Sequence, residues 1–91
     1  MHSTEIAAVR FSTTKWREGY AMEDVDGMRE KIRASLLDWE AGRPGELKAD
    51  SLAQLEFQPT KFRAGYDQDQ VDKFLAGVAA TLKKYESGEH P

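Results

Sequence analysis

The chain has 91 residues, 40% of them hydrophobic and 32% charged, so it can form one small domain, or two very small ones folded together, around a thin core. Thirteen lysines and arginines against sixteen aspartates and glutamates leave a net charge of −3, which argues against nucleic-acid binding over the whole surface, because neutralising phosphates needs clustered cations. The lack of cysteine excludes disulfides and thiolate metal sites. With no secretion signal at the start and no apolar stretch long enough to span a bilayer, we expect a cytoplasmic protein.

An internal repeat with an offset of 46 residues organises the chain. The alignment needs no gap, and roughly a third of the paired positions are identical. For example, residues 14–17 (TKWR) align with residues 60–63 (TKFR). The sequence therefore predicts two equivalent units, residues 1–46 and residues 47–91.

Each unit begins with a short lead and a polar-aromatic loop. Apolar residues three apart in the lead predict a turn or two of helix, with Ser3 or Asp50 as the N-cap. The loops read FSTTKWREGY and FQPTKFRAGY, and Pro59 argues against helix in the second.

A longer helix follows in each unit, at about residues 22–41 and about residues 68–87. Gly42 and Gly88 stand where a left-handed residue ends a helix. Asp67 is a good N-cap for the second helix, whereas the first has Ala21 at that position.

Both long helices carry a narrow apolar stripe at steps of three and four residues. Because a stripe needs a matching stripe to cover it, we predict an all-α fold in which the long helices pack as a short coiled-coil-like pair. The residues between the helices are long enough to return to the start of the first helix, so a parallel pair is the favoured hypothesis. The expected interface is Val25, Met28, Ile32, Leu36 and Trp39 with Val71, Phe74, Leu75, Val78, Leu82 and Tyr85.

The loop motif, followed by an acidic helix start and a Val-Asp pair, resembles the N-terminal domain of the DivIVA family of bacterial cell-division and polar-growth proteins. The segment TKFRAGYDQDQVDKFL is the closer match and TKWREGYAMEDVDGM the looser one. The resemblance implies a parallel helical dimer whose loops meet at one end and contact the inner membrane leaflet. The duplication then implies that one chain imitates this dimer internally.

Carried over residue by residue, the resemblance assigns membrane contact to Phe62 and Arg63, and to Trp16 and Arg17 in the first copy. The neighbouring cations Lys15 and Lys61 add to the site. At about 1 kcal/mol per cation, four cations give an affinity of only about 1 mM, so we expect weak membrane binding that depends on several sites acting together. The alternative is that both aromatic side chains plug the ends of the helix pair and the cations are simply solvated.

Other loop residues are expected to shape the backbone. The glycines supply a positive φ or a close approach, and the tyrosines pack under the loop with their hydroxyls bonded to backbone or to a neighbour. Asp26 and Asp72 either favour the positive helix end or form a salt bridge with a loop arginine of the facing repeat. The residues expected to shape the loops are Gly19, Tyr20, Gly65, Tyr66 and Asp67.

Catalytic chemistry finds little support in the sequence. His2 and His90 stand near the two ends without a serine or aspartate in a recognisable arrangement, and no phosphate loop, metal-ligand spacing or cofactor motif is present. We therefore expect a non-enzymatic adaptor in cell division or in pole and septum organisation, weakly associated with the inner face of the membrane. Its expected partners are a second copy or a longer DivIVA-like protein and an anionic membrane surface, with no nucleic acid and no cofactor. The alternative is a soluble helical protein-interaction module that never binds lipid.

Overall fold

The two repeats fold with the same order of elements: a short helix, two short strands and a long helix. The first repeat contains α1 (Ser3–Ala8), β1 (Thr13–Thr14), β2 (Gly19–Tyr20) and α2 (Met22–Glu40). The second contains α3 (Ala49–Ala53), β3 (Pro59–Thr60), β4 (Gly65–Tyr66) and α4 (Gln68–Glu86). The computed structural model describes residues 1–89, so His90 lies outside the described residues.

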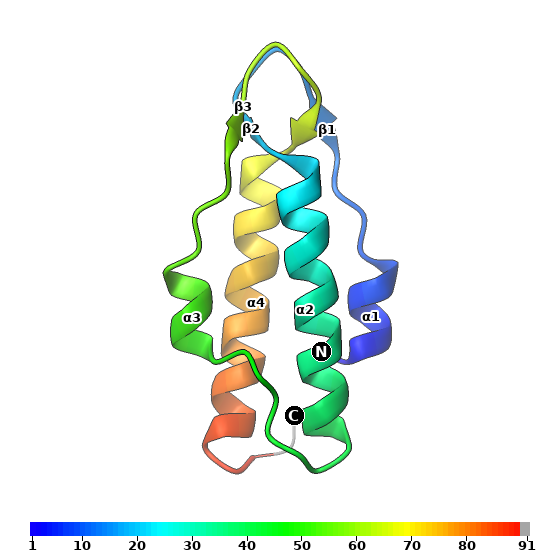
Figure 1. Ribbon diagram of the computed structural model, residues 1–91, viewed down its shortest axis with the longest axis vertical. Helices are drawn as coiled ribbons and strands as arrows, with labels where there is room; N and C mark the ends of the chain where they lie inside the picture. Colours follow the sequence, from blue (N-terminus) through cyan, green and yellow to red (C-terminus); the bar gives the residue numbers. More distant parts are fainter. Residues whose placement is uncertain (90–91) are drawn as a thin grey trace.

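The long helices α2 and α4 lie side by side along the long axis of the molecule, with α1 against α2 and α3 against α4 (Figure 1). Both long helices start at the end that holds the strands, so they run parallel, as the favoured hypothesis expected (Figure 1). Each lies within one residue of its expected range. Gly42 and Gly88 follow them with φ angles of +83° and +88°, the left-handed conformation that ends a helix at little cost only in glycine.

The core is formed mainly by the facing stripes of α2 and α4, and the short helices add Ile6, Ala49 and Leu52 to it. Four residues of the expected interface are only partly buried, because they lie at the edges of the core: Met28, Trp39, Phe74 and Leu75. The buried members of the expected interface are Val25, Ile32, Leu36, Val71, Val78, Leu82 and Tyr85.

The strands show that the all-α expectation was wrong. They form one antiparallel sheet in the order β1-β4-β2-β3. Thr13 pairs with Tyr66, Gly19 with Thr60, and Tyr20 with Tyr66. Each strand has only two residues, too few for an alternating pattern to be visible in the sequence, and each pairs with a strand of the other repeat. The molecule is therefore mixed α and β.

Glutamates at the C-terminal ends of the long helices hold the short helices by hydrogen bonds. Ser3 and Asp50 lie within α1 and α3 rather than at their N-caps, and neither short helix has a side-chain cap of its own. Instead, the carboxylate of Glu40 accepts hydrogen bonds from the Ser3 N–H at 2.7 Å and the Ser3 hydroxyl at 2.8 Å, and Glu86 accepts from the Ala49 N–H at 2.8 Å. Burial alone would raise the pKa of Glu40, but the hydrogen bonds from Ser3 hold that pKa below its usual value. This contact therefore stabilises the fold above the ordinary glutamate pKa and loses its effect as the pH falls.

At the end opposite the strands, the segment 41–48 crosses between the repeats over a stacked aromatic pair. The rings of Trp39 and Tyr85 lie 5.5 Å apart with an interplanar angle of 15°, and the Lys48 ammonium lies 5.1 Å from the Trp39 ring centre. Gly45 is buried against Trp39 of this pair. A Cβ atom at Gly45 would lie 2.6 Å from the Ser35 carbonyl oxygen and 2.7 Å from Trp39 Cδ1, which is closer than van der Waals contact allows.

Two glycine-to-alanine substitutions should therefore have opposite effects on stability. We expect Gly45→Ala to lower the free energy of unfolding by about 1–3 kcal/mol, because the new methyl group overpacks a buried site. Gly27→Ala, in α2 with no atom within 4 Å of the new Cβ apart from the helix's own nearby backbone, should raise it by about 0.5–1 kcal/mol. Urea unfolding of both variants checks this pair. A destabilised Gly27→Ala or a neutral Gly45→Ala would contradict the described packing.

Candidate functional site

The loop between β1 and β2 (residues 15–18) and the loop between β3 and β4 (residues 61–64) meet at one end of the molecule, which we call the tip (Figure 1). The Phe62 N–H donates to the Lys15 carbonyl at 2.9 Å, so the two loops are in direct contact. The tip therefore consists of two loops that cross, one from each repeat.

Hydrogen bonds to the segments just before β1 and β3 hold the start of each long helix. The Asp67 N–H donates to the Ser12 carbonyl, and the Ala21 N–H donates to the Gln58 carbonyl, both at 2.8 Å. These contacts are equivalent under the 46-residue offset. Each long helix thus begins against the other repeat.

Asp24 and Gln70, which the sequence analysis missed, extend this attachment. Asp24 Oδ2 accepts from the Gln58 N–H at 3.0 Å, and Gln70 Oε1 accepts from the Ser12 N–H at 2.7 Å. The available signal was that both repeats carry a side-chain acceptor at this position of the helix start.

The loop glycines Gly19 and Gly65 are needed because the backbones approach each other closely there. This is one of the two reasons that the sequence analysis gave for them. A Cβ at Gly19 would lie 2.8 Å from the Tyr66 carbonyl oxygen, and a Cβ at Gly65 would lie 2.9 Å from the Tyr20 carbonyl oxygen. A Cβ at Gly65 would also overlap the Thr60 hydroxyl. Neither glycine has a positive φ. The two segments can therefore cross only where both lack a side chain.

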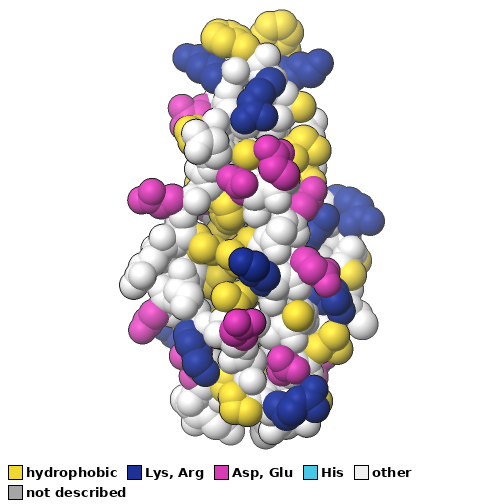
Figure 2. Space-filling model, in the orientation of Figure 1, with side chains coloured by type: hydrophobic (Ala, Val, Ile, Leu, Met, Phe, Trp, Pro, Cys, Tyr) yellow, Lys and Arg dark blue, Asp and Glu magenta, His cyan; other side chains and the backbone are white. Residues whose placement is uncertain are grey.

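The two tip aromatics are exposed rather than placed as plugs. Trp16 is 84% exposed and Phe62 is 74% exposed, the largest values among the big hydrophobic side chains that the structure describes. Figure 2 shows hydrophobic side chains at the upper end of the molecule with dark-blue basic side chains beside them. The four cations expected at this site are also exposed: Lys15, Arg17, Lys61 and Arg63. The structure thus brings together all six residues of the expected site.

Phe62 has an unusual backbone conformation. Its φ angle is +64°, a left-handed conformation that is a genuine outlier for a bulky residue. The hydrogen bond from its N–H to Lys15 and the Lys61 ammonium 5.5 Å from its ring centre accompany this geometry. Such strain, of order 1–3 kcal/mol, persists only where surrounding structure imposes it. Here the strained conformation belongs to a residue whose aromatic ring lies in solvent.

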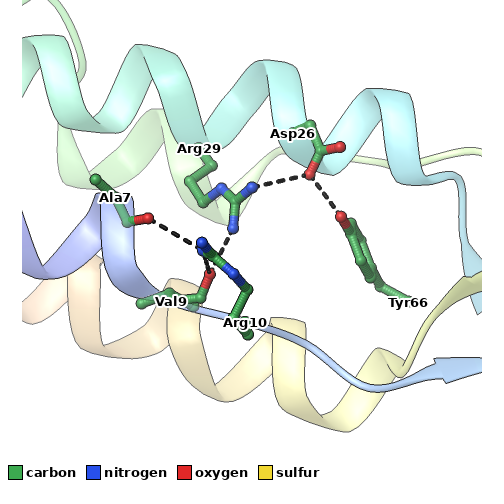
Figure 3. Close-up of polar contacts among 6 residues, drawn as sticks. All are labelled: Ala7, Val9, Arg10, Asp26, Arg29 and Tyr66. Atoms are coloured by element: carbon green, nitrogen blue, oxygen red, sulfur yellow. Dashed lines mark hydrogen bonds and ion pairs between the residues drawn. The ribbon is translucent and has the colours of Figure 1, made fainter.

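Under the tip, each tyrosine donates its hydroxyl hydrogen to an aspartate of the other repeat. Tyr20 Oη donates to Asp72 Oδ1 at 2.8 Å. Tyr66 Oη donates to Asp26 Oδ1 at 2.7 Å, the contact drawn in Figure 3. Burial, and then the hydrogen bond to Asp72, raise the pKa of Tyr20 to about 12. Burial and the bond to Asp26 likewise raise the pKa of Tyr66. The two aspartates therefore tie the loops to the helices through tyrosine, not through the loop arginines that the sequence offered as one alternative.

Around Asp26 the first repeat adds a charged network that the second lacks. Arg29 Nη2 lies 3.3 Å from Asp26 Oδ1, and Arg29 Nη1 donates to the Val9 carbonyl at 2.6 Å (Figure 3). Position 29 corresponds to Leu75 in the second repeat. There the equivalent groove, of about 340 Å³, is lined mainly by apolar side chains: Leu52, Ala53, Leu55, Asp72, Leu75, Ala76 and Ala79.

The two tip arginines also differ in their contacts. Arg17 forms an ion pair with Asp67, the N-cap residue of α4, whose carboxylate also accepts from the Gln70 N–H at 3.0 Å. Arg63 has no carboxylate partner within residues 1–89. The cap position of α2 that corresponds to Asp67 holds Ala21, which is buried.

The raised tyrosine pKa makes stability fall at alkaline pH. An unfolded tyrosine ionises near pH 10, whereas Tyr20 in the folded chain keeps its proton to about pH 12. Between these values the unfolded chain binds fewer protons than the folded one, so the free energy of unfolding decreases as pH rises. We expect Tyr20→Phe and Asp72→Asn both to reduce this alkaline slope. Urea unfolding at several pH values checks the slope, and ultraviolet phenolate absorbance follows the tyrosines directly. A slope unchanged in both variants would contradict this assignment.

Comparison with known proteins identifies no family for this chain. No protein-family model, curated protein or solved structure matches the chain. Within residues 1–89, no helix is both long and apolar enough to cross a membrane, and no group of three potential metal-ligating side chains lies together. The candidate site is therefore the tip, defined by its own geometry: two exposed aromatic rings and four cations on two crossed loops.

Proposed function

We propose that the chain is a non-enzymatic adaptor that binds an anionic membrane surface weakly through its tip. The single observation that carries this proposal is the exposure of Trp16 and Phe62 beside four basic side chains at one end of the molecule. Aromatic rings with cations around them suit the interface of an anionic bilayer, where the rings enter the headgroup region and the cations meet the lipid phosphates.

The position of the tip supports surface contact over burial in a protein partner's core. The tip ends an elongated molecule that measures 43 × 23 × 16 Å, so both aromatics can reach a flat surface at the same time. The parallel helices leave the rest of the molecule standing away from that surface (Figure 1). The strained conformation of Phe62 supports a role for its exposed ring, because strain of this kind gathers at functional sites.

The affinity of one tip is low in this proposal. Each surface cation contributes about 1 kcal/mol at an anionic leaflet, and the nearby Glu18 reduces the total. Stable attachment then requires several tips together, supplied by a second copy or by a longer partner chain. The resemblance to DivIVA N-terminal domains supplies the proposed setting, the inner face of the cell membrane at a septum or pole.

The alternative proposal is a soluble helical module that binds a protein partner and never binds lipid. The same exposed aromatics and helices would serve it. Vesicle binding separates the two proposals, because only the first requires a lipid surface.

Removing the tip aromatics should abolish most vesicle binding without unfolding the protein. We expect the double variant Trp16→Ser and Phe62→Asn to bind phosphatidylglycerol vesicles about ten-fold or more weakly than the wild type at low salt. Asparagine tolerates the positive φ at position 62, so the loop backbone is preserved. Sedimentation of the vesicles, with circular dichroism of each variant, provides the measurement.

Leu37→Asn is the matched control. Leu37 is 44% exposed on α2, near the end of the helix that is remote from the tip, so its loss should leave sedimentation unchanged. A wild type that stays in the supernatant would rule out the membrane proposal in favour of the soluble module. So would a double variant that pellets as well as the wild type.

A further inference from the structure

The repeat makes the two tip arginines equivalent in sequence, but the fold gives them different surroundings. Arg17 extends from the first loop to the N-cap of α4 and forms its ion pair with Asp67 there. The side chain of Asp67 is only 12% exposed, and its carboxylate also accepts a hydrogen bond from the Gln70 N–H. The partner of Arg17 is therefore fixed in place before any ligand arrives.

Arg63 extends from the second loop, where the corresponding cap position holds Ala21. Alanine offers no acceptor, and within residues 1–89 no other carboxylate lies within ion-pair distance of Arg63. Arg63 also directly follows Phe62, the exposed residue with positive φ. Arg63 is exposed, and the ring of the adjacent Phe62 is 74% exposed.

From this asymmetry we infer that Arg63 binds the phosphate group of an anionic lipid headgroup, and that Asp67 is an internal competitor that occupies Arg17. The inference rests on the proposed function and assigns the charge recognition to one of the two loops. A guanidinium presents a planar fork of donors that matches phosphate in a bidentate pair. Arg63 can form this pair directly, whereas Arg17 must first break its contact with a fixed carboxylate.

Single substitutions of the two arginines test the inference at equal net charge. Arg63→Gln should weaken binding to phosphatidylglycerol vesicles by about five-fold, the loss of one surface cation. Arg17→Gln should change binding by less than about two-fold, because that charge is already paired. Equal losses in the two variants would overturn the inference while leaving the proposed function in place. Failure of the wild type to bind vesicles would instead remove the proposed function itself.

Releasing Arg17 is the second test. Asp67→Asn keeps a side-chain acceptor at the N-cap, so α4 retains its cap, but it removes the carboxylate that holds Arg17. Asp69→Asn is the matched control, since it removes the same charge from the same helical turn without breaking an ion pair. We expect Asp67→Asn to strengthen vesicle binding more than Asp69→Asn. In the Asp67→Asn background, Arg17→Gln should then cost about as much as Arg63→Gln.

Equal gains from Asp67→Asn and Asp69→Asn would show a general effect of charge and would overturn the role of Asp67. The reciprocal variant Ala21→Asp places a carboxylate at the equivalent cap of α2. In the folded variant it should weaken vesicle binding by about five-fold, because its carboxylate would occupy Arg63 as Asp67 occupies Arg17. Unchanged vesicle binding by a folded Ala21→Asp variant would count against the inference.

A titration followed by the side-chain NMR signals of the two arginines distinguishes a lipid phosphate from a free one. Phosphatidylglycerol vesicles should perturb the Arg63 signal before the Arg17 signal, and inorganic phosphate at the same phosphate concentration should perturb neither. A response of Arg63 to inorganic phosphate with none to vesicles would assign the site to a free phosphate and overturn the lipid headgroup as its ligand. No response to either probe would overturn the site.

Discussion

The exchange of strands between the two repeats is the constraint on which the rest of the structure depends. β1 pairs with β4, β3 pairs with β2, and the two inner strands meet where Tyr20 faces Tyr66. Because α2 and α4 follow these inner strands directly, the two helices start side by side. Their facing apolar stripes then pack along the same direction (Figure 1). The same crossing brings both loops to one end. The side-by-side start of the long helices and the shared tip both follow from four strands of two residues each.

The polar contacts reinforce this exchange more than they reinforce either repeat. Both tyrosine hydroxyls donate to an aspartate of the opposite repeat, and both long helices begin with a backbone hydrogen bond to the opposite repeat. A single repeat would leave these groups without their partners and would expose the apolar stripe of its own long helix. The cooperative unit is therefore the pair, in agreement with the thin core expected of so short a chain.

The helices could be predicted from the sequence, because their signals are local. Steps of three and four residues and a terminal glycine specify a helix wherever its partner lies. The sheet could not, since two-residue strands show no alternation and their partners lie in the other repeat. Glu40 and Glu86 were missed for a similar reason: they are identical in the two repeats, but a glutamate at a helix end resembles any solvated charge until the short helix packs against it. The six tip residues could be chosen from the resemblance, yet burial preferences alone favoured hiding both aromatics. Their exposure depends on the crossing of the loops, which no local pattern encodes.

The segment 41–48 joins two halves that would otherwise have to find each other in solution. Their encounter becomes intramolecular, so the assembled form persists on dilution. A complex of two identical chains must also carry the same residue at both symmetry-related positions. In a single chain that contains both repeats, the residues at the two equivalent positions can differ. Ala21 opposite Asp67 and Arg29 opposite Leu75 are differences of this kind. A molecule with such differences has two unlike flanks, so a neighbouring molecule meets different side chains on each flank.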